Sequence, residues 1–210
     1  MFYETNNLKD PHHPESRSSC SETVQRIVGM QKDCGRLLIT IDGPCASGKT
    51  TLAQMLAELF EAPVIHTDDY VIPHTQKTAE RLAVPGGNCD ADRLVREVIA
   101  PWKRGAPVKY RKYDCRRDIL LPEEELLDSH ILILEGSYSN LPEIRKFADI
   151  RIFASTPEEI REERLRQRET EQSLQMFRDR WIPLENHYFE AFALPDRECI
   201  MMDLSDEADQ

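Results

Sequence analysis

The chain of 210 residues has the length of one domain of ordinary size and leaves little room for a second. Its formal net charge of −11 disfavours non-specific binding to nucleic acids, because the field of the whole molecule repels phosphate. The first residues carry no apolar stretch of the kind found in signal peptides, and no run approaches the roughly 20 apolar residues that a membrane-spanning helix needs. The six cysteines form no C-x-x-C pair. These features predict a cytoplasmic protein with reduced cysteines, no membrane partner and no nucleic-acid partner.

The first residues differ in character from the rest of the chain. Residues 1–18 are polar, interrupted by proline and without periodicity, so we expect a mobile tail. A single domain should then occupy residues 19–210, beginning with an amphipathic helix from about Ser21 that ends before Gly35.

Five short apolar runs recur along the domain, at residues 36–41, 62–67, 130–135, 148–154 and 198–203. Their hydrophobicity is continuous rather than alternating, which is typical of strands covered on both faces in a parallel sheet. Helical patterns separate the runs, the clearest at residues 52–60 and 94–102. This alternation predicts an α/β doubly wound fold, a five-stranded parallel sheet with helices on both faces that binds its ligands at the carboxyl ends of the strands.

The first run leads into GPCASGKT, residues 43–50, which match G-x-x-x-x-G-K-[ST]. The match follows a predicted strand and opens a predicted helix, the context in which this pattern binds phosphate. In such a loop backbone N–H groups face the β-phosphate, the lysine bridges β and γ oxygens, and the threonine hydroxyl ligates Mg²⁺. The predicted phosphate-binding residues are Gly43, Ala46, Ser47, Gly48, Lys49, Thr50 and Thr51.

Two alternatives for this loop are weaker. An ordinary strand-to-helix turn could contain a lysine by chance, and a dinucleotide-binding loop would need G-x-G-x-x-G, which is absent. We therefore expect the loop to hold a nucleoside triphosphate, as Mg²⁺ with ATP.

Acidic residues end the next two predicted strands. Asp68 and Asp69 follow the second run, where a carboxylate beside the γ-phosphate can take the proton from an attacking hydroxyl, a contribution of about 10²- to 10⁴-fold. A helix cap or magnesium ligation are the alternatives for this pair. Glu135 ends the third run, where such folds place the acid that holds Mg²⁺ or its water. A GTPase would need N-K-x-D, which is absent, so a phosphoryl transferase is favoured.

Residues 156–169 predict an arginine-rich helix on which Arg161, Arg164 and Arg168 share one face. A surface helix with internal salt bridges would explain the glutamates beside them. A lid over the transferring phosphoryl group, spanning about residues 156–182, explains the stripe better, because arginines on one face repel each other unless an anion lies between them.

A basic stretch with tyrosines, residues 103–117, lies between the second and third predicted strands. Basic residues interleaved with aromatic residues are able to stack the bases of a single strand. They could equally line a pocket for one planar base and its neighbouring phosphates, and the acidic remainder of the protein favours the pocket. We therefore interpret residues of about 70–118 as an acceptor-binding insertion.

Together these motifs resemble the uridine kinase-like group of P-loop nucleoside kinases, which includes nicotinamide riboside kinase and is related to phosphoribulokinase and pantothenate kinase. The resemblance covers most of residues 36–203 and rests on IDGPCASGKTTLA, TDDY, NCD, YD, LEGSY and the arginine-rich lid. It implies a P-loop NTPase fold of three layers with strand order 2-3-1-4-5. It also implies transfer of the γ-phosphate of ATP to a primary hydroxyl, the 5′-OH of a ribonucleoside in the nearest relatives, and it allows homo-oligomers.

The resemblance implies roles for particular residues. Asp68 corresponds to the general base and a possible contact to the metal, and Tyr70 to the aromatic residue that follows it. Asp90 corresponds to the residue that binds the ribose hydroxyls, and Tyr113 stands in the Tyr-Asp pair of the acceptor site. The predicted catalytic residues are Asp68, Lys49, Arg164 and Arg168; the predicted acceptor-binding residues are Asp68, Tyr70, Asp90, Tyr113 and Arg164; the predicted metal-binding residues are Thr50, Glu135 and Asp68.

The sequence departs from the uridine kinases in two places. YDCRRDIL lacks the histidine that reads the pyrimidine, and MFRDRWIPLENHYFEAF is loosely similar to the tryptophan-proline segment of nicotinamide riboside kinases. A ribonucleoside kinase for uridine or cytidine is favoured. The alternatives are a kinase for another small acceptor, such as nicotinamide riboside or pantothenate, and a P-loop ATPase or regulator that binds nucleic acid.

Overall fold

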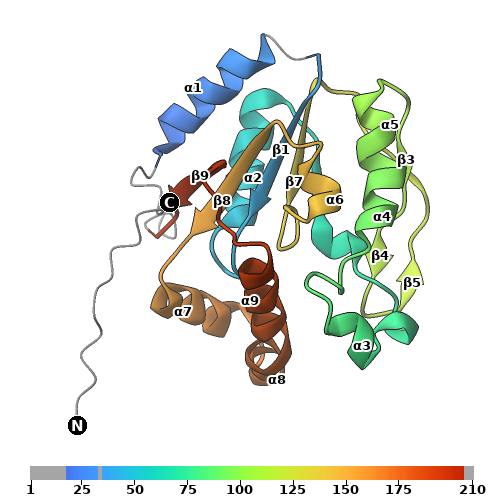
Figure 1. The fold of residues 1–210 in the computed structure, drawn as a ribbon, viewed down its shortest axis with the longest axis vertical. Helices are drawn as coiled ribbons and strands as arrows, with labels where there is room; N and C mark the ends of the chain where they lie inside the picture. Colours follow the sequence, from blue (N-terminus) through green and yellow to red (C-terminus); the bar gives the residue numbers. More distant parts are fainter. Residues whose placement is uncertain (1–17, 33–34, 206–210) are drawn as a thin grey trace.

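The structure, a computed structural model, describes residues 18–32 and 35–205. The predicted tail, but for its last residue, lies outside the described residues. Five parallel strands form one sheet in the order β2-β7-β1-β8-β9 (Figure 1). They are β1 (Leu37–Asp42), β2 (Val64–His66), β7 (Ile131–Glu135), β8 (Ile150–Ser155) and β9 (Cys199–Asp203). Counted among themselves in chain order this is 2-3-1-4-5, so the predicted fold class and strand order are confirmed.

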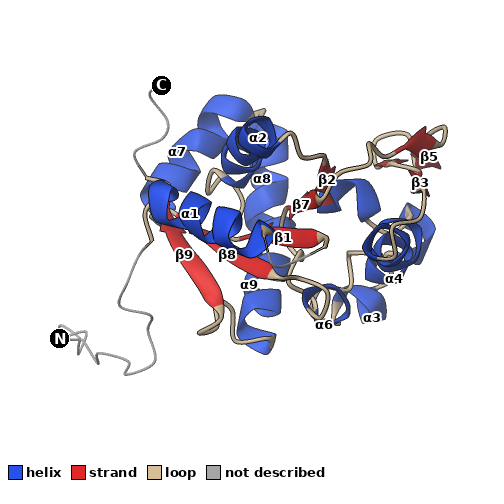
Figure 2. Ribbon diagram, turned by 90° about the horizontal axis from the view of Figure 1, so that it is seen from above, coloured by secondary structure: helices blue, strands red, loops and turns tan. Residues whose placement is uncertain are grey.

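Helices cover both faces of the sheet, as Figure 2 shows. One face packs on α1 (Cys20–Gln31) and α2 (Lys49–Phe60) through residues such as Ile39 and Ile152, which are fully buried. The opposite face, with Leu38 and Leu132, packs on helices from the middle and the end of the chain. Because both faces are covered, the strands need apolar residues at every position, which is why their sequence shows no alternation.

The segment between β2 and β7, residues 67–128, is built from short pieces. Its helical turns are η1 (Thr67–Tyr70), η2 (His74–Gln76), α3 (Ala79–Leu82) and a continuous helical stretch of α4 (Ala91–Leu94), η3 (Val95–Ile99) and α5 (Ala100–Lys103). Its strands are β3 (Lys109–Tyr110) paired with β6 (Glu124–Glu125), and β4 (Tyr113–Asp114) paired with β5 (Ile119–Leu120). These two small antiparallel pairs were not predicted, since strands of two residues are too short to show periodicity.

After β8 the chain forms consecutive helices at the carboxyl ends of the strands (Figure 1). They are α7 (Glu158–Arg168), α8 (Glu171–Met176), η4 (Phe177–Trp181) and α9 (Ile182–Ala191), while the short α6 (Pro142–Arg145) follows β7. We use the name lid for α7, α8 and η4, which fall within residues 156–182; α7 is the helix predicted from the arginine-rich stretch. Among the described residues, none of the helices combines the length and apolar character needed to span a bilayer.

Candidate active site

The phosphate loop, residues 43–50, joins β1 to α2 through backbone conformations that few residues adopt. Gly43 has φ +140°, and a Cβ there would lie 2.3 Å from the carbonyl oxygen of Ala154, so only glycine fits between the loop and β8. Gly48 has φ +92° and Ala46 has φ 59°. Strained backbone of this kind persists where the surrounding structure holds it, and here it turns the loop around a central space.

Lys49 lies inside the loop that it follows. The side chain is buried, and Nζ donates to the carbonyl oxygens of Gly43 and Pro44, both at 2.8 Å. An ammonium group has three protons, so these bonds hold the group in place and leave one proton for a ligand. The loop is therefore already arranged around its lysine.

Oxygen ligands for a magnesium ion meet beside the loop. The Thr50 hydroxyl lies 3.3 Å from Glu135 Oε1, although the two residues come from different elements. A hydroxyl and a carboxylate are ligands that Mg²⁺ prefers, and such ions take one or two protein groups together with phosphate oxygens. Glu135 also contacts His66 Nδ1 at 2.5 Å, and this bond raises the pKa of the His66 imidazole above its usual value. The donor set fits Mg²⁺.

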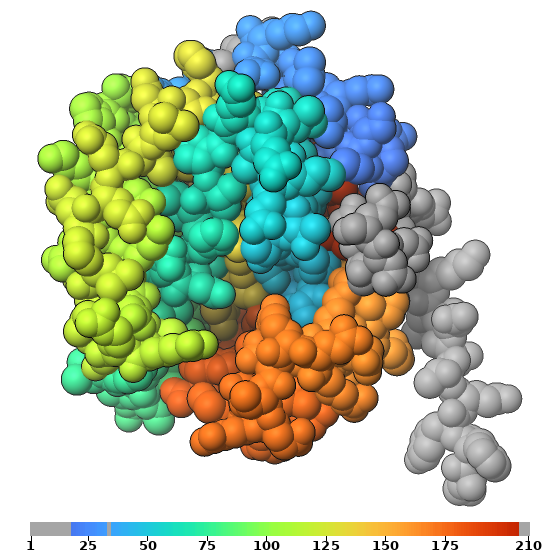
Figure 3. All heavy atoms as spheres, turned by 180° about the vertical axis from the view of Figure 1, so that it is seen from behind, coloured from blue at the N-terminus to red at the C-terminus, as the bar shows by residue number. Residues whose placement is uncertain are grey.

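Asp68 and Asp69 lie in η1, directly after β2, at the same edge of the sheet. The Asp68 side chain is solvent-exposed by surface area, yet protein atoms crowd it on most sides, and this desolvation raises its pKa above the ordinary value. The charge of Glu135 raises that pKa further and the charge of Lys49 lowers it. Desolvation likewise raises the pKa of Asp69. The structure thus brings Asp68 into the electrostatic range of Lys49 and Glu135. On the face drawn in Figure 3, the surface is hollowed between α2, the lid and the segment after β2.

Tyr70 and Asp90 come together, but in different environments. The Asp90 N–H donates to the Tyr70 carbonyl oxygen at 2.6 Å, and the Asp90 carboxylate begins α4 by accepting from the Arg93 N–H. The Tyr70 side chain is fully buried, with the Arg93 guanidinium 4.1 Å above its ring. The Tyr70 ring therefore belongs to the hydrophobic core in this structure, and its contact with the acceptor stays a prediction.

Part of the basic stretch, residues 103–117, is paired within the protein. Lys103 contacts Asp149 at 2.5 Å, Lys112 contacts Glu124 at 3.0 Å, and the Tyr113 hydroxyl donates to Asp118. The Tyr113 side chain is 5% exposed, so its hydroxyl is committed to that bond rather than open to the cleft. Arg104, Arg116 and Arg117 of the same stretch are exposed.

The lid arginines point to three different partners. Arg161 donates to the Thr156 carbonyl oxygen, and Arg164 donates to the carbonyl oxygens of Ala46 at 3.3 Å and Leu204 at 2.8 Å. The exposed Arg168 pairs with its neighbour Glu169 at 2.9 Å. Of these three arginines, Arg164 is the one with a hydrogen bond to the phosphate loop, and it bonds a backbone carbonyl oxygen there.

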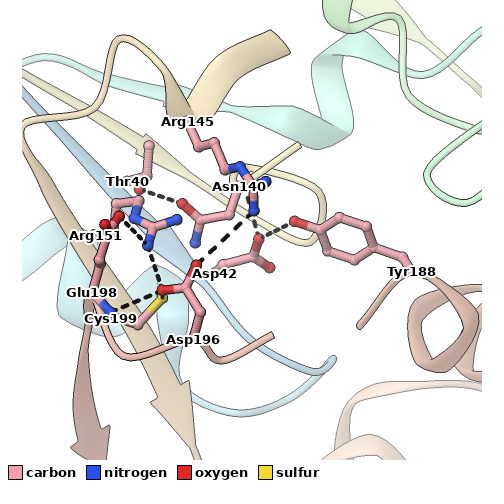
Figure 4. A network of polar contacts seen from close by, with 9 residues as sticks. All are labelled: Thr40, Asp42, Asn140, Arg145, Arg151, Tyr188, Asp196, Glu198 and Cys199. Carbon is pink, nitrogen blue, oxygen red and sulfur yellow. Dashed lines mark hydrogen bonds and ion pairs between the residues drawn. The ribbon is translucent and has the colours of Figure 1, made fainter. Parts of the chain in front are cut away.

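Two buried acids next to the loop were missed by sequence reasoning. Asp42 accepts from the Tyr188 hydroxyl at 2.7 Å, the Gly43 N–H at 2.8 Å and the Asn140 N–H at 2.9 Å, as Figure 4 shows for its Tyr188 contact. Burial is the main cause that raises the pKa of Asp42 to about 6, and these hydrogen bonds oppose it. The available signal was an acid at the end of a fully apolar strand, which a buried position tolerates only with partners.

The second missed acid is Glu185 on α9, whose Oε2 accepts from the Cys45 N–H at 3.0 Å. The sequence around Glu185 did not predict its role, because the buried side of α9 carries both polar and apolar residues.

Comparison with known proteins places this geometry in a family. The model of the phosphoribulokinase/uridine kinase family matches residues 38–173, well over half of the chain. The chain belongs to the phosphoribulokinase/uridine kinase family. It is therefore a P-loop kinase that uses ATP, and the resemblance found in the sequence is confirmed.

Solved structures show the same fold. A possible uridine kinase from Bacillus stearothermophilus is 24% identical with a TM-score of 0.64, covering 87% of this chain and 100% of that one. A protein from Silicibacter sp. TM1040, provisionally described as a fructose transport system kinase, is 22% identical with a TM-score of 0.64, covering 84% and 96%. At these identities the likeness establishes the fold alone. No curated protein matches the chain.

Proposed function

We propose that this kinase transfers the γ-phosphate of ATP to a primary hydroxyl of a small acceptor, and that the 5′-OH of a ribonucleoside is the favoured acceptor. The observation that carries the proposal is the approach of Asp68 to Lys49 and Glu135, since the charges of both act on its carboxylate. A proton acceptor, a phosphate-binding lysine and a metal-supporting acid at one edge of the sheet are the parts that phosphoryl transfer requires.

Each group has a distinct role in the proposed transfer. Lys49 and the N–H groups at the start of α2 hold the β- and γ-phosphates, because the first turn of a helix leaves its N–H groups without intrahelical partners. Thr50 and Glu135 would hold Mg²⁺, which when bound neutralises charge on the phosphate oxygens. Asp68 takes the proton of the acceptor hydroxyl as that oxygen attacks the γ-phosphorus, the bond from that phosphorus to the β–γ bridging oxygen breaks, and ADP leaves with the bonding electrons. Positioning and charge neutralisation then supply most of the rate.

The acceptor is proposed to bind along the segment after β2. The Asp90 side chain is 32% exposed, with one oxygen capping α4 and the other 3.4 Å from Arg93 Nε, and we propose that its exposed part binds the ribose hydroxyls. We propose a single kinase domain over residues 19–210, with the acceptor-binding insertion at about 70–118 and the lid at about 156–182. The provisional description of one structural neighbour adds fructose to the acceptors worth testing.

The test is a screen of ATP consumption by the purified protein with uridine, cytidine, nicotinamide riboside, pantothenate and fructose, with mass spectrometry of the product. We expect a phosphorylated ribonucleoside whose formation needs Mg²⁺. Turnover stimulated by single-stranded RNA, with no phosphorylation of any small acceptor, would contradict the proposal. Phosphorylation of fructose or pantothenate alone would retain the chemistry and replace the acceptor.

A further inference from the structure

A buried carboxylate joins the two loops that end the central strands. Glu185 is 7% exposed; its Oε2 accepts from the Cys45 N–H at 3.0 Å, and its Oε1 accepts from the Ser137 hydroxyl. The Ser137 hydroxyl also lies 3.4 Å from the carbonyl oxygen of Gly43. One side chain on α9 therefore holds both the phosphate loop after β1 and the loop after β7. The family match ends at residue 173, so it does not include this residue.

Electrostatics alone would not favour an acid at this position. Burying a carboxylate costs several kcal/mol unless hydrogen bonds replace its water. The charge of Glu185 also raises the pKa of Asp68, which shows that the two acids repel each other. Glutamine would have nearly the same shape without that repulsion. The position of Glu185 is thus better explained by its hydrogen bonds to Cys45 and Ser137 than by its negative charge.

The lid packs on the same residue of the loop. Cys45 packs with Leu165 and Leu174 of the lid in a buried apolar cluster that also includes Ala46, Phe177 and Ile182. Ile182 begins α9 directly after the lid, so Glu185 lies within one turn of the lid's end. A hydrogen bond from α9 and apolar contacts from the lid therefore meet at Cys45.

We propose that Glu185 is a positioning residue that couples lid closure to the phosphate loop. While the lid is closed, the carboxylate fixes the Cys45 N–H and the Ser137 hydroxyl; when this contact breaks, the lid separates from the loop. The contact is compatible with bound nucleotide, because it uses neither Lys49 nor the N–H groups at the start of α2. Glu185 itself touches no reacting atom.

Tryptophan fluorescence of the full chain reports the lid position. Trp181 ends the lid, with its ring 5.6 Å from Lys77 Nζ and 4.9 Å from Arg180 Cζ, whereas Trp102 is 1% exposed. A neutral quencher such as acrylamide therefore acts mainly on Trp181. Quenching constants would be measured with no ligand, with MgADP and with a non-hydrolysable MgATP analogue.

The variants are Glu185→Ala and Glu185→Gln, with Glu190→Ala as control, because Glu190 is exposed on the same helix. Glu185→Ala should raise the quenching constant about twofold or more and lower kcat about tenfold or more, while MgADP affinity stays near wild type. Glu185→Gln should restore both values, since its amide oxygen accepts from Cys45 and its amide nitrogen donates to Ser137. Glu190→Ala should change neither.

Unchanged quenching in Glu185→Ala would overturn the proposal, even if kcat fell. A loss of thermal stability in both variants without a change at Trp181 would also overturn it, since that is the behaviour of a purely structural residue. If Glu185→Ala does not fold, Ser137→Ala decides, because it removes one of the two bonds and should raise quenching by a smaller factor. The quenching measurement needs no acceptor, so its outcome is independent of the proposed nucleoside specificity.

Discussion

The phosphate side and the acceptor side of this kinase differ in how their residues are used. On the phosphate side, Lys49 Nζ is held by a carbonyl oxygen of its own loop, and the Thr50 hydroxyl lies beside Glu135. On the acceptor side, Tyr70 is buried in the core and Tyr113 is bonded to Asp118. The phosphate side depends on a backbone conformation that a short sequence motif specifies. The acceptor side depends on the directions of side chains, which vary with the packing around them.

This difference predicts that substitutions on the two sides separate kinetically. Changes at the phosphate side should affect every acceptor equally, whereas changes at the acceptor side should alter the acceptor KM and leave nucleotide binding intact.

The largest effect is expected for Lys49→Ala. It removes the cation that the loop holds with two 2.8 Å hydrogen bonds, so kcat/KM for ATP should fall about 10³-fold or more. Steady-state kinetics and nucleotide titration measure this. Lys112→Ala is the control, because Lys112 pairs with Glu124 on the acceptor side. Equal losses of ATP binding in both variants would contradict the separation of the phosphate side from the acceptor side.

Asp68→Asn should produce the next largest effect. An amide cannot take the acceptor proton, so kcat should fall about 10²-fold or more while ATP affinity stays nearly unchanged. Asp69→Asn tests the neighbouring acid of the same turn and should cost much less. If ATP affinity and turnover fall together in Asp68→Asn, the residue is structural or a metal ligand rather than the base.

Asp42 should make stability fall as the pH rises. Its folded pKa of about 6 lies above the ordinary 3.8, so the folded state holds the proton more tightly than the unfolded state. The resulting stability is complete below pH 3.8 and is lost as the pH rises through about 6, a change of about 3 kcal/mol. Denaturant unfolding from pH 4 to 7 should show a steeper decline in wild type than in Asp42→Asn. Parallel curves would show that Asp42 does not titrate as a buried acid.

Much of the fold was predictable because its signals are local. The continuous apolar runs predicted the five strands, and the spacing of Gly43 and Lys49, between a predicted strand and a predicted helix, identified the loop. Contacts between distant residues gave no such signal. The bond from Glu185 to Cys45 spans 140 positions, and the bond from Tyr188 to Asp42 spans 146. Their existence depends on how α9 returns across the sheet, which periodicity does not encode.

The arginine stripe shows a second reason why side-chain contacts are hard to predict from sequence. Arg161, Arg164 and Arg168 do share a helical face, but each side chain is long enough to reach a different partner. A shared helical face therefore does not imply shared protein partners, and the predicted contact of Arg164 and Arg168 with the phosphoryl group stays a prediction.

Arg93→Ala should separate the acceptor side from the phosphate side. The Arg93 guanidinium donates to the carbonyl oxygens of Asp69 at 2.9 Å and Arg111 at 2.7 Å, and packs over the Tyr70 ring. Its loss leaves buried acceptors unpaired, so stability should fall by about 1–3 kcal/mol. The acceptor KM should rise about tenfold with the ATP KM unchanged. Arg96→Ala on the same helical stretch, whose side chain is 70% exposed, should behave as wild type in thermal melts and kinetics.

The smallest effect is expected for Arg168→Ala. The side chain is 57% exposed and pairs with Glu169, and exposed ion pairs contribute only about 0–1 kcal/mol. We expect kcat within about threefold of wild type, because the guanidinium contacts no residue of the phosphate loop. Arg164→Ala should cost more, since Arg164 joins Ala46 to Leu204 behind that loop. If instead Arg168→Ala loses more turnover than Arg164→Ala, the lid must turn on binding so that Arg168 leaves Glu169 for the phosphoryl group. The lid would then act together with the phosphate side in binding the transferred group.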